Sequence, residues 1–218
     1  MDEKICFIVG SGSNYGIDEV VNGDGYVIAA DGGYRYLFEA GRVPDLVIGD
    51  FDSLGFSPDT GKVIKLSNEK DYTDTLAAVY EGMKLGFNTF HIYCGTGGRI
   101  DHTIANIQAL KLLSDKGCCG MLFDKNHVIT AVSDRQLIFD KNCSGYISVF
   151  SLTDDCTGVF IKGFKYELEG ASLKNSFPLG VSNEFSGSEG VIYCSSGTLL
   201  VCFPRGFETH AEFKNKKL

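Results

Sequence analysis

Two aspartates that stand one residue apart, Asp50 and Asp52, are the clearest chemical signal in the sequence. They follow residues 46–49, an apolar run that predicts a short buried strand. Side chains at positions i and i+2 of an extended chain share a face, with their Cα atoms about 6.6 Å apart. Two carboxylates so placed can hold a hard cation such as Mg²⁺, which in turn binds phosphate oxygens. A simple turn is the other interpretation, because aspartate and serine hydrogen-bond locally to the backbone.

Three more acids stand where a helix is expected to begin. Asp31 follows the strand expected at residues 26–30, and it either caps the next helix or makes a polar contact in a cleft. Asp71 and Asp74 are three residues apart, which is the spacing of a capping box with aspartate in place of glutamate. Capping alone accounts for such residues, but acids close to the Asp50 pair could also complete a metal site.

A second group of polar residues follows the strand expected at residues 90–94. A glycine-rich stretch, in which the backbone can approach a ligand closely, leads to Arg99, Asp101 and His102. The planar guanidinium of Arg99 suits phosphate oxygens. His102 stands at the start of a helix expected at residues 103–113, where a histidine is more often structural than catalytic.

The elements that must position these residues alternate between strand and helix over residues 1–133. Continuous apolar runs at residues 5–10, 26–30 and 46–49 suit strands that are buried on both faces. The alternation predicts an α/β domain with a mostly parallel sheet and helices on both faces. Ligands bind at the carboxyl edge of such sheets, so we expect the acids and Arg99 to gather at one edge.

The loop at residues 10–16 is rich in glycine and serine, and it resembles a phosphate-binding loop. It lacks the Lys-Ser/Thr of a P-loop and a regular Gly-x-Gly-x-x-Gly. We therefore interpret it as a plain turn, and it contributes no residue to the predicted site.

The pattern changes near residue 134. Short runs of alternating apolar and polar residues follow one another, separated by glycine, asparagine and serine, and no helical period persists. This pattern predicts an all-β sandwich over residues 134–218, after an α/β domain over residues 1–133. A β domain of that size has a modest core, so we expect it to pack against another surface. The polar and basic tail from residue 210 is expected to fray.

Composition excludes several classes of function. The net charge of −8 argues against a nucleic-acid-binding protein, which would carry a basic face. Apolar runs fall short of the ~18 residues that a membrane-spanning helix needs, and the N-terminus leads directly into a strand without a signal peptide. The eight cysteines are scattered without a Cys-x-x-Cys, so we expect reduced thiols in a cytoplasmic protein rather than a zinc site.

Five short motifs follow one another along nearly the whole chain. They are Asp31-Gly32-Gly33, Gly49-Asp50-Phe51-Asp52-Ser53, Asp71-Tyr72-Thr73-Asp74, Gly98-Arg99-Ile100-Asp101-His102 and Val181-Ser182-Asn183. Each motif alone is weak, but their order and spacing together resemble those of the thiamine pyrophosphokinase family. The resemblance implies an α/β domain and a β-sandwich in a homodimer. It also implies an enzyme that transfers pyrophosphate from ATP to the hydroxyethyl group of thiamine, giving thiamine diphosphate and AMP.

The resemblance implies roles for individual residues as well. The acidic Mg²⁺ site would consist of Asp50, Asp52 and Asp74. The nucleotide would be bound by these acids together with Asp31, Lys70, Thr73, Arg99 and His102. The catalytic residues would be Asp71, Asp101 and Arg99, with one of the aspartates accepting the thiamine hydroxyl proton. The thiamine contacts would be Tyr166, Ser182 and Asn183. Eukaryotic members commonly have tryptophan at the position of Tyr166, and some members have glutamine at that of Lys70.

The implied chemistry suits these residues, because phosphoryl-type transfer needs positioning and charge neutralisation more than covalent help. We expect in-line attack of the thiamine hydroxyl on the β-phosphorus in a site shared between two chains. Three other functions fit parts of the pattern: a Mg²⁺-dependent nucleotidyl- or glycosyltransferase with an Asp-x-Asp site, an enzyme with another primary-alcohol acceptor, and a non-catalytic sensor that binds thiamine diphosphate or nucleotide. Release of AMP that depends on added thiamine separates them.

The substitution Asp52→Asn tests the metal site, because it keeps the shape of the side chain and removes its charge. We expect turnover to fall by at least ~100-fold, the scale seen when a preorganised electrostatic group is lost. The variant should still fold, since a lost cap costs only ~1 kcal/mol. Steady-state turnover and circular dichroism check both points, and near-normal turnover in a folded variant would contradict the metal site.

Overall fold

The structure of the chain, a computed structural model, describes residues 4–51, 62–67 and 71–215. The chain divides into two compact units. The first consists of Met1–Ala109 with Gly120–Asp124, and the second of Leu110–Cys119 with Lys125–Leu218. The sequence pattern predicts a boundary at residues 133 and 134, whereas the division of the structure assigns residues 127–132 to the second unit.

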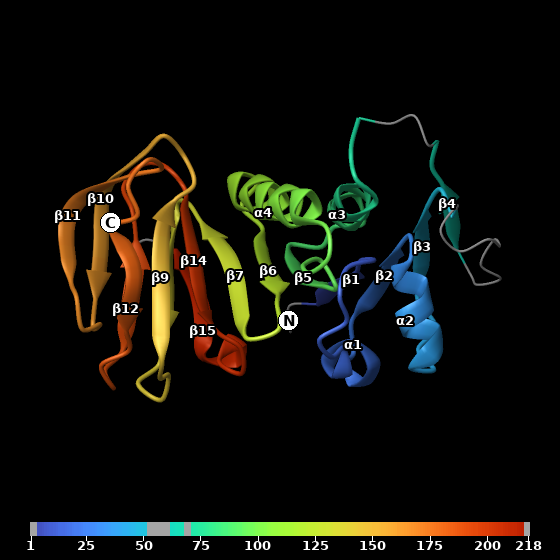
Figure 1. The fold of residues 1–218 in the computed structure, drawn as a ribbon, viewed down its shortest axis with the longest axis horizontal. Coiled ribbons are helices and arrows are strands. Elements are labelled where there is room, and N and C mark those ends of the chain that lie inside the picture. The colour runs from blue at the N-terminus through green and yellow to red at the C-terminus, as the bar shows by residue number, and fades with distance from the viewer. Residues whose placement is uncertain (1–3, 52–61, 68–70, 216–218) are drawn as a thin grey trace. The chain divides into compact units, whose positions relative to one another are not determined.

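The first unit holds the parallel strands and most of the helical residues (Figure 1). Its strands lie in the order β6-β5-β1-β2-β3-β4, and the pairs that join β5 to β1, β1 to β2, β2 to β3 and β3 to β4 are all parallel. This arrangement agrees with the parallel sheet predicted from the alternation of strand and helix. The elements are β1 (Ile5–Val9), α1 (Asp18–Asn22), β2 (Tyr26–Ala30), α2 (Gly33–Glu39), β3 (Leu46–Gly49), β4 (Val63–Lys65), α3 (Asp74–Lys84), β5 (Thr89–Tyr93), α4 (Ile100–Asp115) and β6 (Cys119–Phe123).

Strand β1 is apolar throughout because helices cover both of its faces. A Cβ at Gly23, which caps the C-terminus of α1, would lie 3.2 Å from the ring of Phe7. A Cβ at Gly82 in α3 would lie 3.0 Å from Sγ of Cys6. Neighbouring residues of a strand point to opposite faces, so α1 and α3 lie on opposite sides of β1. Helices on both faces were expected from the doubly buried strand pattern.

The second unit is built almost entirely from antiparallel strands. One group has the order β12-β9-β14-β7, and the other has the order β11-β10-β13-β8-β15. Phe139 of β8 packs edge-on against Phe203 of β14 with 5.0 Å between the ring centroids, and both rings are fully buried. The two groups therefore share an aromatic core, as in the expected sandwich. The elements are β7 (His127–Val132), β8 (Arg135–Phe139), β9 (Tyr146–Ser151), β10 (Asp155–Lys162), β11 (Leu168–Lys174), β12 (Gly180–Glu184), β13 (Gly190–Tyr193), β14 (Leu199–Pro204), the 3-10 helix η1 (Glu208–His210) and β15 (Ala211–Asn215).

The C-terminal tail corrects one expectation. Residues 211–215 form β15 and pair with β8 along the whole strand, with Phe213 opposite Leu137. The expectation that the chain frays from residue 210 is therefore wrong for this segment. Backbone pairing with β8 orders it despite its charged side chains, because β8 would otherwise leave an edge of unpaired backbone groups.

The cysteines are reduced, as their scattered positions in the sequence predict. All eight cysteines are free; Cys118 and Cys202 are half-buried and the others are buried. Burial raises the pKa of Cys6 to about 12, so this thiol stays protonated and unreactive.

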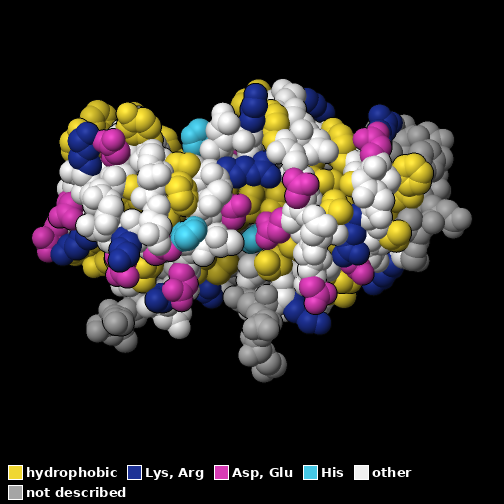
Figure 2. Space-filling view, turned by 90° about the horizontal axis from the view of Figure 1, so that it is seen from below, with side chains coloured by type: hydrophobic (Ala, Val, Ile, Leu, Met, Phe, Trp, Pro, Cys, Tyr) yellow, Lys and Arg dark blue, Asp and Glu magenta, His cyan; other side chains and the backbone are white. Residues whose placement is uncertain are grey.

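Acidic and basic side chains are interspersed on the face shown in Figure 2. Within the described ranges, every helix is too short or too polar to cross a membrane.

Candidate functional site

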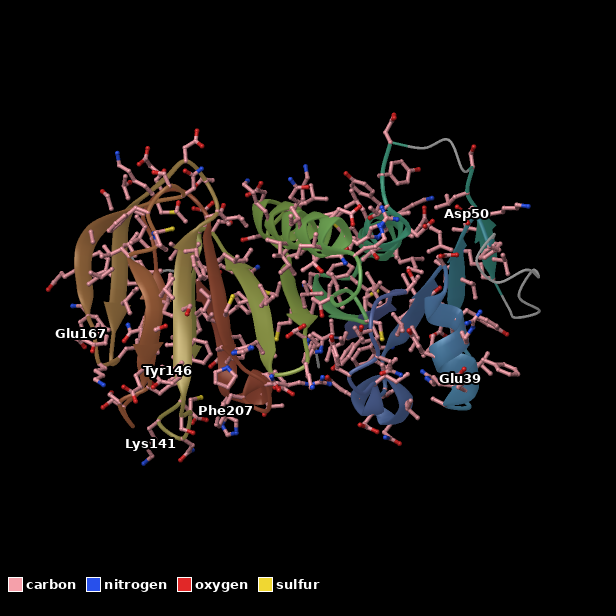
Figure 3. All side chains as sticks on the ribbon, viewed as in Figure 1. Glu39, Asp50, Lys141, Tyr146, Glu167 and Phe207 are labelled. Carbon is pink, nitrogen blue, oxygen red and sulfur yellow. The ribbon has the colours of Figure 1, made fainter. Side chains whose placement is uncertain are left out.

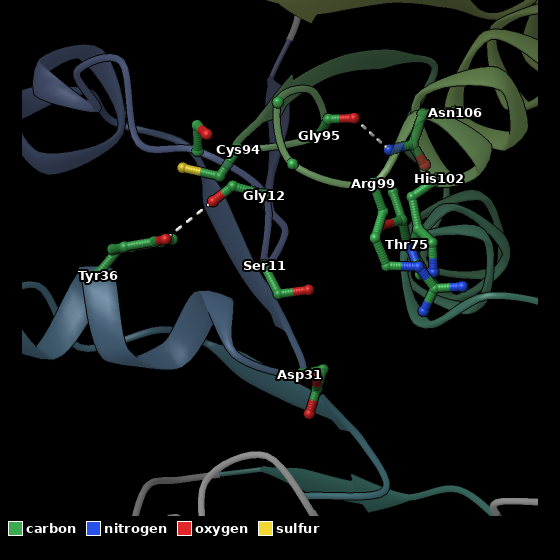
Figure 4. A pocket seen from close by; sticks show the side chains of 13 residues that line it. Ser11, Gly12, Asp31, Tyr36, Thr75, Cys94, Gly95, Arg99, His102 and Asn106 are labelled. Atoms are coloured by element: carbon green, nitrogen blue, oxygen red, sulfur yellow. Dashed lines mark hydrogen bonds between the residues drawn. The ribbon is translucent and has the colours of Figure 1, made fainter.

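The carboxyl ends of β1 and β5 mark the place where the strand order of the first unit reverses. From β1 the chain adds β2, β3 and β4 on one side, and β5 then pairs with the other side of β1. Ligands of open α/β sheets bind outside the carboxyl ends of the strands at such a switch point. A cavity of about 430 Å³ lies here, lined by residues that follow β1, β2 and β5 and by residues of α2, α3 and α4 (Figure 4).

Two loops along this cavity, residues 10–13 after β1 and residues 94–98 after β5, are hydrogen-bonded to each other. The N–H of Gly12 donates to the carbonyl oxygen of Cys94 at 2.7 Å, and the N–H of Ser13 donates to that of Thr96 at 2.8 Å. A Cβ at Gly12 would lie only 2.5 Å from the Thr96 carbonyl oxygen, so this close approach requires glycine. The glycine–serine loop that the sequence led us to interpret as a turn therefore lines the cavity.

Two hydrogen bonds of buried side chains tie the loop at residues 94–98 to α4 and to the chain after β6. Nδ2 of Asn106 in α4 donates to the carbonyl oxygen of Gly95 at 2.7 Å (Figure 4). The hydroxyl of Thr96 donates to Oδ1 of Asp124, which follows β6, at 2.6 Å. Asn106 and Thr96 are each 3% exposed. Because buried polar groups are costly to leave unpaired, these bonds fix the shape of the loop.

The loop at residues 10–13 is held from the other side by Tyr36 of α2. Its hydroxyl donates to the carbonyl oxygen of Gly12 at 2.8 Å (Figure 4). Burial raises the pKa of Tyr36 above its ordinary value, and the phenol therefore stays a neutral donor across the physiological pH range. Both loops of the cavity are thus anchored by side chains that lie outside them.

Arg99 and His102 lie together on one side of the cavity, next to Thr75 (Figure 4). The Arg99 guanidinium forms a bidentate pair with Asp101, with Nη2 to Oδ2 at 2.6 Å and Nε to Oδ1 at 3.2 Å. The hydrogen bond from Arg99 lowers the pKa of Asp101, and the same bond raises the pKa of Arg99. Both side chains are mostly exposed, so solvent screens the pair and an incoming anion can compete for Arg99.

Asp31 and Asp50 follow the adjacent strands β2 and β3. The N–H of Asp31 donates to the carbonyl oxygen of Ile48 at 2.8 Å, and a Cβ at Gly49 would lie 3.0 Å from Cα of Asp31. Asp31 lines the cavity, and Asp50 lies at the end of β3 (Figure 3). Asp31 has a φ of 47°, a left-handed conformation that is uncommon outside glycine and often occurs at functional sites.

The N-cap residues of α2 and α3 differ from those expected from the sequence. The N-cap residue of α2 is Gly32 rather than Asp31, so the interpretation of Asp31 as the N-cap is wrong. The N-cap of α3 is Thr73, whose hydroxyl accepts a hydrogen bond from the N–H of Leu76 at 3.2 Å. The capping box expected between Asp71 and Asp74 is therefore wrong as well. Asp74 is the first helical residue, where its charge suits the positive end of the helix dipole.

Two expected site residues, Asp52 and Lys70, lie outside the described residues. Within the part of the chain that the structure describes, no three histidine, cysteine, aspartate or glutamate side chains come together as a metal site. The described acids at this edge offer oxygen ligands alone, which suit Mg²⁺. Mg²⁺ typically takes one or two carboxylates and completes its shell with phosphate and water. These donors therefore fit a Mg²⁺ ion that arrives with a phosphate group.

The expected thiamine residues come together in the second unit, at the edge strand β12. Ser182 is exposed and has a φ of 58°, and Tyr166 is 61% exposed. Asn183 is only 4% exposed, and its side chain is hydrogen-bonded to the backbone of Tyr166 through both its oxygen and its nitrogen. The three residues are therefore neighbours, but Asn183 is turned inward while the other two face outward.

Several residues that line or shape the cavity were missed by the sequence interpretation. Asn106 follows His102 by four residues, so helical spacing alone places both on one side of α4 and could have identified it. Asp124 belongs to the same pattern of acids at strand ends. Tyr36 and Thr75 carry no local pattern, since their contacts depend on how α2 and α3 pack.

Comparisons with known proteins identify the family of the chain. A family model described as thiamin pyrophosphokinase, catalytic domain, matches residues 17–119, and one described as thiamin pyrophosphokinase, vitamin B1 binding domain, matches residues 127–199. The thiamine pyrophosphokinase of Bacillus subtilis is 29% identical over 182 residues, which cover 80% of this chain and 85% of that protein. The thiamin pyrophosphokinase 1 of Caenorhabditis elegans is 26% identical over 189 residues, covering 80% of this chain and 77% of that protein.

Solved structures are similar over nearly the whole chain. The crystal structure of thiamine pyrophosphokinase from Bacillus subtilis has a TM-score of 0.81 and 27% identity, and covers 93% of this chain and 99% of that one. The crystal structure of yeast thiamin pyrophosphokinase has a TM-score of 0.77 and 15% identity, and covers 94% of this chain and 87% of that one. At this identity the likeness shows the fold alone. The two family models follow one another and together match most of the sequence. The chain belongs to the thiamin pyrophosphokinase family.

Proposed function

We propose that this protein transfers the pyrophosphate group of ATP to the hydroxyl of thiamine, which yields thiamine diphosphate and AMP. The observation that carries the proposal is the match of a catalytic model and a vitamin B1-binding model, in that order, on one chain. The curated relatives that match over most of their length are named for this activity. A switch-point cavity of about 430 Å³, within the usual size of small-molecule sites, supports it further.

We propose that ATP binds in this cavity. Arg99 offers a planar fork of donors to phosphate oxygens, and His102 adds a second donor beside it. Arg99 is engaged with Asp101 in the free protein, but that pair is exposed and therefore weak. Phosphate oxygens can displace the Asp101 carboxylate from Arg99, or bind Arg99 beside it, at little cost. The Arg99–Asp101 pair therefore keeps the guanidinium oriented until the nucleotide binds.

We propose Mg²⁺ as the metal, held by Asp50, Asp52 and Asp74 together with oxygens of the nucleotide. The ion, when bound, neutralises part of the charge on the phosphate chain. The acids themselves have a second effect that needs no metal: thiamine carries a fixed positive charge, and an acidic edge attracts it. Asp31, which lines the cavity, adds to this negative potential.

The proton of the thiamine hydroxyl needs an acceptor, and Asp71 and Asp101 are the two residues considered. Arg99 lowers the pKa of Asp101, which weakens Asp101 as a proton acceptor. Asp71 is exposed ahead of the N-cap of α3. We therefore favour Asp71 as the acceptor and assign Asp101 the role of holding Arg99. Little proton transfer is required early in a loose phosphoryl transition state, so this role is secondary to positioning.

We propose that two chains form a homodimer whose active sites are shared, with the acids and Arg99 from one chain and Tyr166, Ser182 and Asn183 from the other. The second unit exposes large apolar side chains in and around β12, between 43% and 64% exposed: Tyr146, Tyr166, Phe177, Leu179 and Val181. Large apolar side chains that stay exposed near one edge strand suit an interaction surface. Two-fold dimers are the commonest closed assembly of identical chains.

We propose the cytoplasm as the compartment and small molecules as the partners. Eight free cysteines suit a reducing environment. An acidic net charge disfavours nucleic acid, because phosphate backbones are bound by lysine and arginine.

The substitution Asn106→Ala tests whether the loop at residues 94–98 must be held in shape for the nucleotide. Loss of the buried bond to Gly95 should weaken AMP binding roughly tenfold and lower the free energy of unfolding by about 1–3 kcal/mol. Titration calorimetry with AMP and urea denaturation measure the two effects. Gln108→Ala, an exposed position in the same helix, is the control and should change neither. Wild-type AMP affinity in Asn106→Ala would contradict the role of this bond.

The nucleotide product tests the reaction itself. With ATP and thiamine as substrates, the purified protein should form AMP and thiamine diphosphate in equal amounts, because the whole pyrophosphate group moves in one step. Ion-exchange chromatography of the reaction separates the products, and a sample without thiamine controls for ATP hydrolysis. Appearance of ADP and thiamine monophosphate would instead show transfer of a single phosphate and overturn the proposal.

Shared active sites predict that two impaired variants restore activity when mixed. Asp52→Asn removes an acid of one unit, and Asn183→Ala weakens thiamine binding at the other. At a thiamine concentration well below the wild-type KM, the first homodimer should be nearly inactive and the second about tenfold less active than wild type. After joint unfolding and refolding, one site of each mixed dimer carries both changes and the other carries neither.

The activity of the mixture, measured as thiamine-dependent AMP release, should therefore exceed that of either variant refolded alone. Wild-type protein refolded in the same way is the control for recovery. A mixture that contains verified mixed dimers and gains no activity would show that each site is built within one chain.

A further inference from the structure

The side chain of Asn183 makes three hydrogen bonds to backbone groups. Oδ1 accepts hydrogen bonds from the N–H of Tyr166 at 2.9 Å and from the N–H of Glu184 at 2.8 Å. Nδ2 donates to the carbonyl oxygen of Tyr166 at 2.7 Å. With 4% of its surface exposed, the carboxamide lies beneath the surface that Tyr166 and Ser182 form.

These bonds extend a row of backbone hydrogen bonds between two segments, with the side chain of Asn183 as the last partner. Phe164 and Phe185 form an antiparallel bridge, and the N–H of Lys165 donates to the carbonyl oxygen of Glu184 at 2.9 Å. At the next residue, Tyr166, the carboxamide of Asn183 takes the place of a backbone peptide and serves both the N–H and the carbonyl. Only an amide side chain carries an acceptor and a donor side by side, so asparagine is suited to this position and aspartate or serine is not.

A β-bulge turns Asn183 inward. The pairing register of β12 with β9 shifts between Gly180 and Asn183, and Ser182 at the shift has a φ of 58°. Val181 is 43% exposed, whereas in a regular strand it would share a face with Asn183. Bulges re-aim side chains and occur frequently beside active sites. Here the bulge exposes Ser182 and buries the next side chain.

The group that Asn183 holds is an exposed aromatic residue. Tyr166 is 61% exposed, and Nζ of Lys165 lies 5.7 Å from its ring centroid. Lys165 is itself paired with Glu184 at 2.5 Å. The backbone of Tyr166 is therefore fixed by Asn183, and one neighbour of its ring is fixed by Glu184. An exposed ring so held is a preorganised contact for a flat ligand.

We infer that Asn183 is a positioning residue for the thiamine site: its carboxamide fixes Tyr166, whose ring contacts thiamine, and does not contact thiamine itself. The inference rests on the proposed function, and it changes the role that the motif resemblance implied for Asn183. Two backbone N–H groups already bond to Oδ1, and the side chain is only 4% exposed. Contact between Oδ1 and thiamine would therefore require Tyr166 or Glu184 to lose a hydrogen bond.

A double-mutant cycle with Asn183→Ala and Tyr166→Ala tests the inference. Thiamine binding is measured by titration calorimetry, alongside the KM values for thiamine and ATP. If Asn183 acts through Tyr166, Asn183→Ala should weaken thiamine binding about tenfold in the wild-type background and less than about twofold in the Tyr166→Ala background. The KM for ATP should stay the same in all variants. The control Asn175→Ala, an exposed asparagine bonded to Asp154, should behave as wild type.

The isosteric variant Asn183→Asp separates the two roles by charge, and it replaces Asn183→Ala in the cycle if that variant does not fold. A carboxylate keeps the acceptor for the two N–H groups but repels the Tyr166 carbonyl oxygen, so positioning predicts weaker thiamine binding. Direct contact predicts tighter binding, because a new negative charge would face a cation.

Three results would each overturn the inference. The first is that Asn183→Ala weakens thiamine binding equally in the wild-type and the Tyr166→Ala backgrounds. The others are tighter thiamine binding by Asn183→Asp and unchanged thiamine binding by Tyr166→Ala. Failure of the proposed function is a different result, in which wild-type protein releases no thiamine-dependent AMP. Calorimetric binding of thiamine remains measurable in that case, so the cycle still decides the role of Asn183.

Discussion

The hydrogen bonds that β1 makes along both of its edges determine where the site lies. β1 pairs with β2 on one side and with β5 on the other, and all three strands run parallel. Beyond the strand, the bonds continue on the β5 side: the N–H of Gly10 donates to the carbonyl oxygen of Tyr93, and that of Gly12 donates to the carbonyl oxygen of Cys94. On the β2 side, α2 begins so close to the end of β1 that a Cβ at Gly33 would collide with the carbonyl of Val9. The chain after β1 is thus drawn toward β5 while α2 covers the other side, and the cavity occupies the space between them.

Part of this arrangement follows from the sequence by general rules. Continuous apolar strands alternating with helices imply a parallel sheet, and the carboxyl ends of its strands share an edge, so the order of residues alone assigns Asp31, Asp50 and Arg99 to that edge. Other contacts have no local signal. Tyr36 reaches the loop after β1 because of how α2 packs, and β15 is ordered by a partner strand far away in the sequence. Capping was ambiguous for a different reason: Asp71, Thr73 and Asp74 are all good N-caps, and only the packed position of α3 selects Thr73.

Electrostatics explains why Arg99 carries its own counter-ion. The chain has a net charge of −8, and the acids at the cavity edge would repel the phosphates of a nucleotide. A lone arginine near these acids could be drawn toward any of them. Its bidentate pair with Asp101, two residues away at the start of α4, gives the guanidinium a fixed orientation instead. Because the pair is exposed, exchange of Asp101 for a phosphate group is nearly balanced in energy. Under the proposed function, such a site would attract the cationic acceptor through its acids and would still present the cation of Arg99 to the nucleotide.

Motif residues of this chain divide into those that can face a ligand and those whose side chains bind backbone. Thr73 uses its hydroxyl to cap α3, and Asn183 uses its carboxamide to hold Tyr166. A substitution at either position acts first on the local backbone, even when it preserves polarity. Tyr166 stands outside the five motifs, and its backbone is fixed while its ring is exposed. The ring at this position can therefore change, as from tryptophan to tyrosine, without disturbing the strands that carry it. Under the proposed function, the motifs would set the geometry of the reaction, and Tyr166, whose backbone Asn183 holds in place, would contribute to the affinity for thiamine.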